Sequence, residues 1–184
     1  MSLLIVLIAL IVISLIVVFV KTYKDERGKA LHMPKIHECF TLNELVMAIN
    51  HGRVYPYYTG MTIEQVRKIV TYNHENTREF ENNFHLCSLM GVSPIIELPK
   101  FINEHLIKNV SMYPNKRGLI SSITIDIEDF ESKQGELLAY MFVKFGQPAS
   151  INGQFIIWRE RFMVINVDNE SGSISVIDER LFNN

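Results

Sequence analysis

Two histidine–cysteine pairs are the residues whose types and spacing most suggest chemistry. His37 is followed by Cys39, and His85 by Cys87. Residues two apart point to the same side of an extended backbone, so the four side chains together match the Cys₂His₂ set of a tetrahedral zinc site. Zinc modules usually hold their cysteines in a tight knuckle with glycines, and neither pair has one. We therefore expect no metal or cofactor, with Cys87 a small buried side chain and the other three in local packing or at the surface.

Other catalytic motifs are absent from the sequence. The letters HEC at 37–39 begin like a zinc deaminase motif, but no Pro-Cys-x-x-Cys follows. There is no nucleophile elbow, phosphate-binding loop or dinucleotide-binding turn. Neighbouring acids such as Glu128 and Asp129 would point apart on regular structure. The sequence therefore favours a protein that is not an enzyme.

Three tyrosines around Pro56 are the first candidates for binding. Tyr55, Tyr57 and Tyr58 lie in the segment GRVYPYYTG, between two expected helices. Rigid aromatic rings with hydroxyl groups are enriched at protein interfaces. The alternative is that these rings cover a sheet edge and support the core.

A pair of arginines is the second candidate. Arg159 and Arg161 follow Trp158, which we expect in the core because it lies in an apolar strand. Strand alternation then turns the arginines outward, where they can meet an acidic partner. The predicted partner-binding residues are Tyr55, Tyr57, Tyr58, Arg159 and Arg161.

Capping and periodicity predict the elements that position these residues. Thr41 with Glu44, and Thr62 with Gln65, each form a capping box at the start of an amphipathic helix, the first of which ends at Gly52. Alternating apolar and polar residues predict strands further on. In chain order we expect helices from 41 and from 62, a polar connector over 71–106 with a helix over 100–106, a hairpin of 106–113 with 119–127, a helix over 133–145 capped by Ser132, and antiparallel strands over 154–160, 161–168 and 172–178.

This order of elements predicts the fold class. Helices followed by strands, twice along the chain, indicate an α+β domain with helices packed on an antiparallel sheet. Both halves run helix, glycine-ended turn, then strands, so two diverged helix-then-strands repeats are a further possibility. Beyond the N-terminal segments lie about 150 residues, enough for one domain with its own core.

A single transmembrane helix is predicted at the N-terminus. Between Leu3 and Val20 only Ser14 is polar. A helix of about eighteen residues is roughly 27 Å long, close to the thickness of the hydrocarbon core. A cleaved signal peptide fits less well, because no basic residue precedes Leu3 and no small-x-small site follows; a buried helix of a soluble protein is the other alternative. We expect residues 3–20 to lie in a lipid bilayer and residues 1–21 to form the anchor.

The charges beside the apolar stretch predict its orientation. Four basic residues follow it directly: Lys21, Lys24, Arg27 and Lys29. Because Lys and Arg are enriched on the cytoplasmic side of membrane helices, we expect a single-pass protein of the bacterial cell inner membrane with its C-terminal domain in the cytoplasm. Residues 22–38 then form a charged juxtamembrane tether, and residues 39–184 form the globular domain.

The overall charge argues against one class of partner. The chain has 18 Lys and Arg against 20 Asp and Glu, a formal net charge of −2, and no long basic run. Because nucleic-acid binding relies on clustered cations, we expect no nucleic-acid partner. The two cysteines, Cys39 and Cys87, are expected to be reduced in the cytoplasm.

The segment YYTGMTIEQVRKIV carries a resemblance to a known family. It resembles the Gly-Met-Thr helix opening of outer-membrane assembly lipoproteins typified by small protein A, whose fold is similar to that of β-lactamase inhibitor proteins. On that motif Gly60 permits a turn, Thr62 caps the helix, and Val66, Ile69 and Val70 pack. This sequence departs from the family where TYNHEN follows the helix, and no lipid-accepting cysteine occurs near the N-terminus.

The later segments FGQP and FIIWRERFMVINVD are similar in plan to bacterial immunity proteins that neutralise polymorphic toxins. This resemblance is one of architecture and implies no site residues. We therefore expect a membrane-anchored, non-enzymatic protein-binding domain, with immunity against a toxin as the implied role. An envelope-assembly or scaffold protein with an extracytoplasmic domain is one alternative, and a zinc-binding enzyme or sensor is another. The sequence does not define an oligomeric state.

Overall fold

The computed structural model describes residues 33–50, 52–73, 95–98 and 105–182. The predicted anchor over residues 3–20, the pair His85 and Cys87, and most of the connector lie outside these ranges. Within them, no helix is both long enough and apolar enough to cross a membrane. The described part of the chain belongs almost entirely to one compact unit that begins at Pro34.

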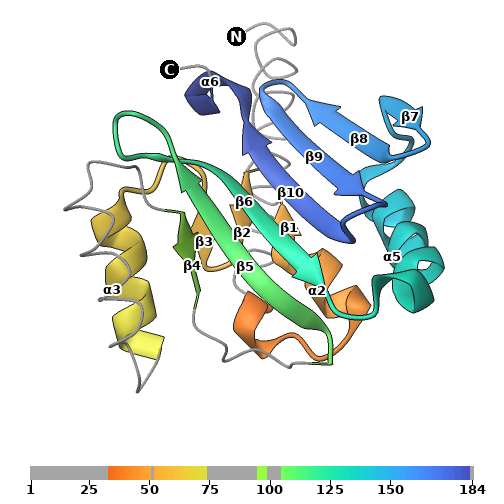
Figure 1. Cartoon of the computed structure of the whole chain (residues 1–184), viewed down its shortest axis with the longest axis horizontal. Helices are drawn as coiled ribbons and strands as arrows, with labels where there is room; N and C mark the ends of the chain where they lie inside the picture. The colour runs from red at the N-terminus through yellow and green to blue at the C-terminus, as the bar shows by residue number, and fades with distance from the viewer. Residues whose placement is uncertain (1–32, 51, 74–94, 99–104, 183–184) are drawn as a thin grey trace, which may run out of the picture. The chain divides into compact units, whose positions relative to one another are not determined.

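A seven-stranded antiparallel sheet is the centre of this unit, and it confirms the predicted α+β class (Figure 1). The hairpin β5–β6 and the meander β8–β9–β10 follow the predicted strands closely. The last strands of these two groups, β6 and β10, pair at the middle of the sheet. In spatial order the strands are β4 (Ile96–Glu97), β5 (Ile107–Pro114), β6 (Ile120–Ile127), β10 (Ser173–Asp178), β9 (Met163–Asp168), β8 (Phe155–Glu160) and β7 (Ser150–Asn152).

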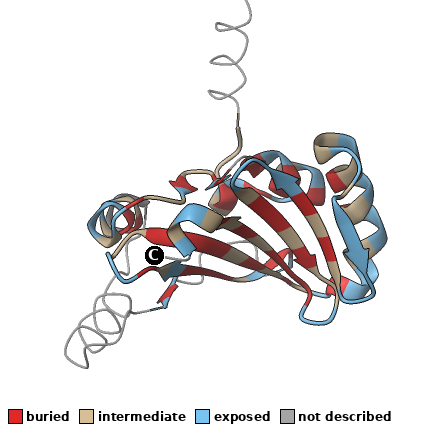
Figure 2. Cartoon of the chain, turned by 90° about the horizontal axis from the view of Figure 1, so that it is seen from above, coloured by how far each residue is buried: buried red, intermediate tan, exposed pale blue. Residues whose placement is uncertain are grey.

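One face of the sheet forms the hydrophobic core. The helix α5 (Phe130–Phe145) covers it, and the ring of Phe142 meets Trp158 edge-on at 5.7 Å. Figure 2 shows the helices α2 (Leu42–Ala48) and α5 together on one side of the strands. One row across this face, at most 5% exposed, is Met112, Ile123, Val176, Ile165 and Trp158.

Small polar side chains cover the middle of the opposite face. The next row, shifted by one residue, is Ser111, Thr124, Ser175 and Asn166, and on β8 it continues with the apolar Ile157. The hydroxyl groups of Thr124 and Ser175 are hydrogen-bonded across the strands at 2.9 Å. The alternation of apolar and polar residues therefore separates a core face from a polar face, as predicted.

The helix α2 (Leu42–Ala48) begins as the sequence predicts. The Thr41 hydroxyl accepts from the Glu44 N–H at 3.2 Å, and the Glu44 carboxylate accepts from the Thr41 N–H at 3.1 Å. The helix ends before Gly52, because Ile49–Asn50 becomes strand β1 of a small antiparallel sheet. The other strands of that sheet are β2 (Arg53–Val54) and β3 (Tyr57–Tyr58).

Lys144 of α5 forms hydrogen bonds to the C-terminal end of α2. Its ammonium group donates to the carbonyl oxygens of Val46 at 2.7 Å, of Met47 at 3.0 Å, and of Ile49. Carbonyls in the last turn of a helix lack helical partners and carry partial negative charge, so a cation there stabilises the helix end. Burial lowers the pKa of Lys144 to about 8.

The helix α5 starts earlier than predicted. It begins at Phe130, which is buried, and the residue before it is Asp129 in a left-handed conformation with φ 49°. Ser132 does not cap the helix, since its hydroxyl donates to the Asp129 carbonyl at 2.8 Å. The predicted end is confirmed: Gly146 has φ 73°, and its N–H bonds to the Phe142 carbonyl.

The helix α3 (Ile63–Asn73) has the predicted capping box, with both hydrogen bonds between Thr62 and Gln65 present at 2.8 and 3.2 Å. The connector differs from its prediction. Within it, Ile96–Glu97 forms strand β4, and His105 and Leu106 lie in a turn rather than in a helix.

The N-terminal boundary of the domain also differs from the prediction. Ile36, in the short 3-10 helix η1 (Ile36–Glu38), is 0% exposed, and its N–H donates to the Tyr55 carbonyl at 2.6 Å. The last residues of the predicted tether therefore pack with the domain. Two further short elements, β7 and α6 (Glu179–Phe182), were also not predicted.

Candidate functional site

The structure separates the three predicted tyrosines. On the two-residue strand β3, Tyr57 is 1% exposed and Tyr58 is 40% exposed. Tyr55 precedes them and is half-buried. The prediction that Tyr57 contacts a partner is corrected, because its ring lies in the core, where burial raises the pKa of its hydroxyl group. Tyr58 and part of Tyr55 stay accessible.

Tyr58 carries an arginine over its ring. Arg53 of β2 lies directly opposite Tyr58 in the antiparallel register, on the side that faces away from the core. Its guanidinium carbon is 5.9 Å from the centre of the Tyr58 ring, within the range of a cation–π contact. The contact orients both side chains at the surface.

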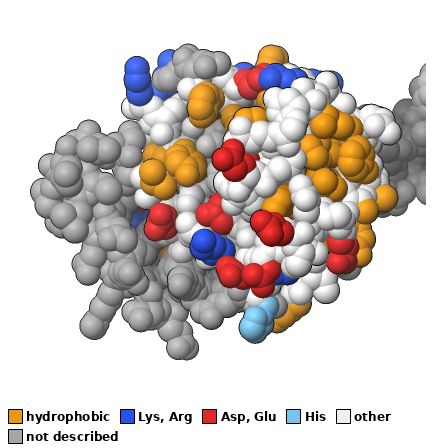
Figure 3. Space-filling model, turned by 45° about the vertical axis from the view of Figure 1, so that its right-hand side comes forward, with side chains coloured by type: hydrophobic (Ala, Val, Ile, Leu, Met, Phe, Trp, Pro, Cys, Tyr) orange, Lys and Arg blue, Asp and Glu red, His pale blue; other side chains and the backbone are white. Residues whose placement is uncertain are grey.

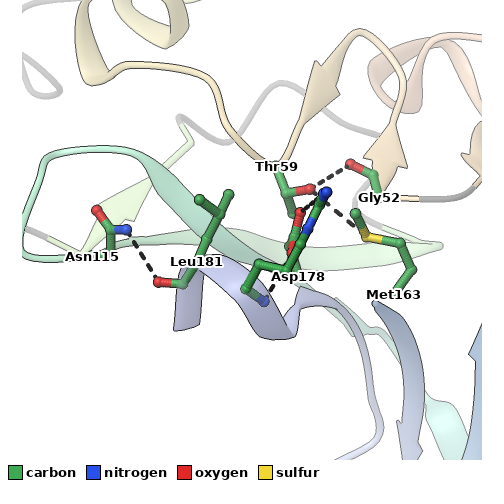
Figure 4. Close-up of polar contacts among 7 residues, drawn as sticks. Gly52, Thr59, Asn115, Met163, Asp178 and Leu181 are labelled. Carbon is green, nitrogen blue, oxygen red and sulfur yellow. Dashed lines mark hydrogen bonds and ion pairs between the residues drawn. The ribbon is translucent and has the colours of Figure 1, made fainter. Parts of the chain in front are cut away.

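Met163 lies between the small sheet, which contains Arg53 and Tyr58, and the β8–β9 turn, which contains Arg161. The Thr59 hydroxyl, one residue after Tyr58, donates to the Gly52 carbonyl at 3.3 Å and lies 4.0 Å from the Met163 sulfur (Figure 4). Met163 begins β9, directly after the turn that contains Arg161 and Phe162. The small sheet and the β8–β9 turn are therefore neighbours, although a hundred residues separate them.

Of the two predicted arginines, Arg159 lies in β8 just before this turn and Arg161 lies in the turn. Arg159 is exposed and forms an ion pair with Glu179 of α6 at 2.5 Å. Arg161 is exposed and has φ 53°, so it occupies the turn itself. Among the described residues, no carboxylate pairs with Arg161 or with Arg53. The prediction that Arg159 and Arg161 face outward agrees with their exposure.

A buried carboxylate positions a further arginine. Asp178 has a side chain only 2% exposed, and it accepts from Arg180 Nε at 3.0 Å and from Arg180 Nη2 at 2.7 Å. The hydrogen bonds from Arg180 hold the pKa of Asp178 below its usual range. The Arg180 guanidinium then lies 5.0 Å from the centre of the Phe162 ring, and the Phe162 carbonyl accepts from the Glu179 N–H at 2.9 Å. Phe162 is thus held in place while 51% exposed.

These residues lie around the small sheet, the β8–β9 turn and the start of α6, and we call them together the basic surface. Sequence reasoning identified three of its members and missed Arg53, Phe162 and Arg180. The signal available for Phe162 was its position beside Arg161, and the signal for Arg180 was its spacing of two from Asp178. The basic surface consists of Arg53, Tyr58, Arg159, Arg161, Phe162 and Arg180.

The possible zinc ligands are only partly within the described residues. Cys39 is 1% exposed, its thiol donates to the Lys35 carbonyl at 3.3 Å, and burial raises its pKa to about 12. A thiol with that pKa stays protonated near neutral pH, whereas a zinc ligand must be a thiolate. His37 lies 3.8 Å from the Glu38 carboxylate, and burial lowers its pKa. The described ranges contain no group of three or more metal-binding side chains.

Comparison of the chain with protein-family models, with curated proteins and with solved structures gives no match. The basic surface offers guanidinium groups and two exposed rings, which are groups enriched at protein interfaces.

Proposed function

We propose that this protein is a single-pass membrane protein whose α+β domain binds another protein through the basic surface. Arginine, tyrosine and phenylalanine are the residue types enriched at protein interfaces and among the residues that dominate binding energy. Arg53 and Arg161, which form no ion pair with a carboxylate among the described residues, favour a partner with acidic groups at the contact. Tyr55 lies next to this surface and is proposed to contribute at its margin.

The observation that carries this proposal is a series of contacts: Asp178 binds Arg180, and Arg180 packs against the ring of Phe162. An exposed phenylalanine in a turn is ordinarily free to rotate, and ordering it on binding costs about 0.5–1.5 kcal/mol. Here the buried carboxylate fixes the guanidinium and the guanidinium supports the ring. A rigid aromatic side chain at the surface lowers the entropy cost of binding.

The membrane part of the proposal rests on the sequence of residues 3–20. We place these residues in the bacterial inner membrane, with residues 1–21 as the anchor and the domain on the cytoplasmic side. Immunity against a toxin, the role implied by the architectural resemblance, is the specific form of the proposal. An engineered C-terminal cysteine tests the orientation: it should resist a membrane-impermeant thiol reagent in intact spheroplasts.

The alternative role in envelope assembly draws on the Gly-Met-Thr segment. Gly60 has φ 93° and Thr62 caps α3, as the resemblance implies. This role requires an extracytoplasmic domain, so labelling of the C-terminal cysteine in intact spheroplasts would favour it. The pairing of β6 with β10, each the last strand of its group, also supports the proposal of two diverged repeats.

Affinity purification of the full-length protein in mild detergent tests partner binding. We expect one protein to be retained by wild type and reduced at least about tenfold by Arg161→Glu, because the reversal places two like charges at the contact. Lys116→Glu is the matched control, since Lys116 is an exposed cation of the β5–β6 turn, outside the basic surface. Equal loss with both variants, or retention by Arg161→Glu, would contradict the proposal.

A further inference from the structure

A shallow depression lies at the other end of the sheet from the basic surface. It has a volume of about 790 Å³ and lies between the β6–α5 turn and the β9–β10 turn. Ile127 and Phe130 are its apolar residues, and Asp129, Glu131 and Glu170 are its charged ones. In Figure 1 these turns lie at the lower right of the sheet, whereas α6 lies at the top. Strand β9, next to the central strand β10, runs from one end to the other.

Close packing and hydrogen bonds define the shape of the depression. Gly172 lies so close to Phe130 that an added Cβ would be 2.7 Å from the Phe130 Cβ. The Asp168 carboxylate accepts from the Glu170 N–H at 3.0 Å, which shapes the turn. Gln134 of α5 donates to the Asn169 side chain at 3.0 Å, so the helix and the turn are joined.

The two ends of the sheet differ in charge: the basic surface has four arginines against Asp178, Glu179 and the exposed Glu160, whereas the charged residues of the depression are all acidic. The depression is lined by three carboxylates and by no Lys, Arg or His. The nearby Lys133, which is not in that lining, donates to the carbonyl oxygens of His105 and Glu128. Figure 3 shows most of the visible Lys and Arg side chains near the upper margin and most of the Asp and Glu side chains in the middle and lower part.

We infer that two copies of this chain associate head to tail, with the basic surface of one copy against the depression of the next. Phe162 of the first copy meets the small accessible apolar area of Ile127 and Phe130, and Arg161 meets the carboxylates around it. This inference rests on the basic surface of the proposed function and names a second copy as one partner of it. Charge complementarity favours this occupant, because the same chain carries both surfaces.

Such a contact joins two different surfaces, so each associated pair keeps one free basic surface and one free depression. Contacts of this kind produce rings when the rotation closes and open chains when it does not. Anchoring in one membrane would hold the copies in one layer and favour lateral chains. A symmetric dimer would instead use the same surface twice.

Two variants that are each unable to form chains test the inference. Arg161→Glu removes the basic partner, and Glu170→Arg removes the acidic one; both residues are exposed turn positions. We expect the full-length wild-type protein, in detergent at low salt, to show a mass in sedimentation that rises with concentration. Each variant alone should stay monomeric. An equal mixture should form heterodimers and nothing larger, because only one complementary contact survives.

The controls separate this inference from the proposed function. Lys68→Glu changes an exposed cation of α3 and should associate like wild type. Raising the salt from about 0.05 to 0.5 M should weaken wild-type association about tenfold or more. A wild-type monomer at all concentrations, or a dimer that neither variant disrupts, would overturn the inference. In that case the proposed function would still stand if affinity purification with wild type retained a different protein and purification with Arg161→Glu did not.

Discussion

The two ends of the central sheet are built in different ways. At the basic end, long side chains from distant segments meet, and buried groups hold them: Asp178 holds Arg180, and Lys144 holds the end of α2. At the acidic end, consecutive residues in two turns supply the charges, and a glycine allows the turn to approach α5. The basic end therefore depends on tertiary contacts, whereas the acidic end depends mainly on local backbone conformation.

Substitution of one glycine at each end should cause the largest difference in unfolding free energy between the two ends. Gly172→Ala adds a Cβ 2.7 Å from the Phe130 Cβ at φ +70°, so both the backbone and the core must shift, and we expect a loss of roughly 2–4 kcal/mol in unfolding free energy. Gly52→Ala, at φ +69°, meets the flexible ends of Met163 and Thr59 at 2.8 Å, and we expect about 1–2 kcal/mol.

Urea unfolding followed by fluorescence measures both losses, because Trp158 is the only tryptophan in the chain and lies in the core. A Gly52→Ala variant less stable than Gly172→Ala would show that the acidic end is the more adaptable of the two.

Substitutions of the two lysines of α5 should cause losses of unfolding free energy of intermediate size, and they compare the two ends of this helix. Lys144→Met leaves three carbonyls of the α2 terminus without their donor, so we expect a loss of about 1–3 kcal/mol. Lys133→Met removes contacts to two carbonyls at the more exposed N-terminal end of α5, so we expect less than about 1 kcal/mol. Similar losses from the two variants would contradict the difference in burial.

The pH dependence of stability separates Lys144 further. Its folded-state pKa of about 8 lies below the ordinary value of 10.5, so the unfolded chain binds more protons between these values and stability should rise with pH. Cys39 acts in the opposite direction from about pH 8 upward, because its pKa is raised from 9.0 to about 12 and the unfolded thiol already ionises there. Between pH 8 and 9 we expect wild type to gain about 1 kcal/mol relative to Lys144→Met, which lacks the lysine but keeps the cysteine.

Variants of the two ion pairs of the basic surface should show the smallest difference in unfolding free energy. Asp178→Asn weakens two hydrogen bonds of a buried carboxylate, for which we expect a loss of roughly 1–2 kcal/mol. Glu179→Gln weakens an exposed pair with Arg159, for which about 0–1 kcal/mol is expected. Thermal unfolding near neutral pH compares them. Because the pKa of Asp178 is lowered in the folded state, its advantage should fade as the solution is acidified through the ordinary range of a carboxyl group.

Local signals predicted most of the fold. Both capping boxes, at Thr41 and at Thr62, occur where the residue types place them, because a cap involves groups only three residues apart. The strand alternation in β6 and the meander β8–β10 also follow directly from the sequence. Strands of two or three residues, such as β4 and β7, give too short a pattern to be recognised.

The candidate site was predictable only in part. Tyr57 and Tyr58 are adjacent and identical, and which of them is buried depends on a two-residue strand that the sequence does not mark. The start of α5 was misplaced because burial of Phe130 outweighs the capping preference of Ser132. Joining Arg53 to Phe162 requires the packing of Met163 against Gly52, a contact between residues far apart in sequence.

Site-specific photocrosslinking in living cells tests the central claim most directly. A photoreactive phenylalanine analogue replaces Tyr58 or Phe162 in the basic surface, and Val143 of α5, 86% exposed, serves as the control position. The account predicts adducts of the same mass from positions 58 and 162, lost when Arg161→Glu is added, and none from position 143. Adducts from position 143 alone, or adducts at 58 and 162 that persist with Arg161→Glu, would contradict binding through the basic surface.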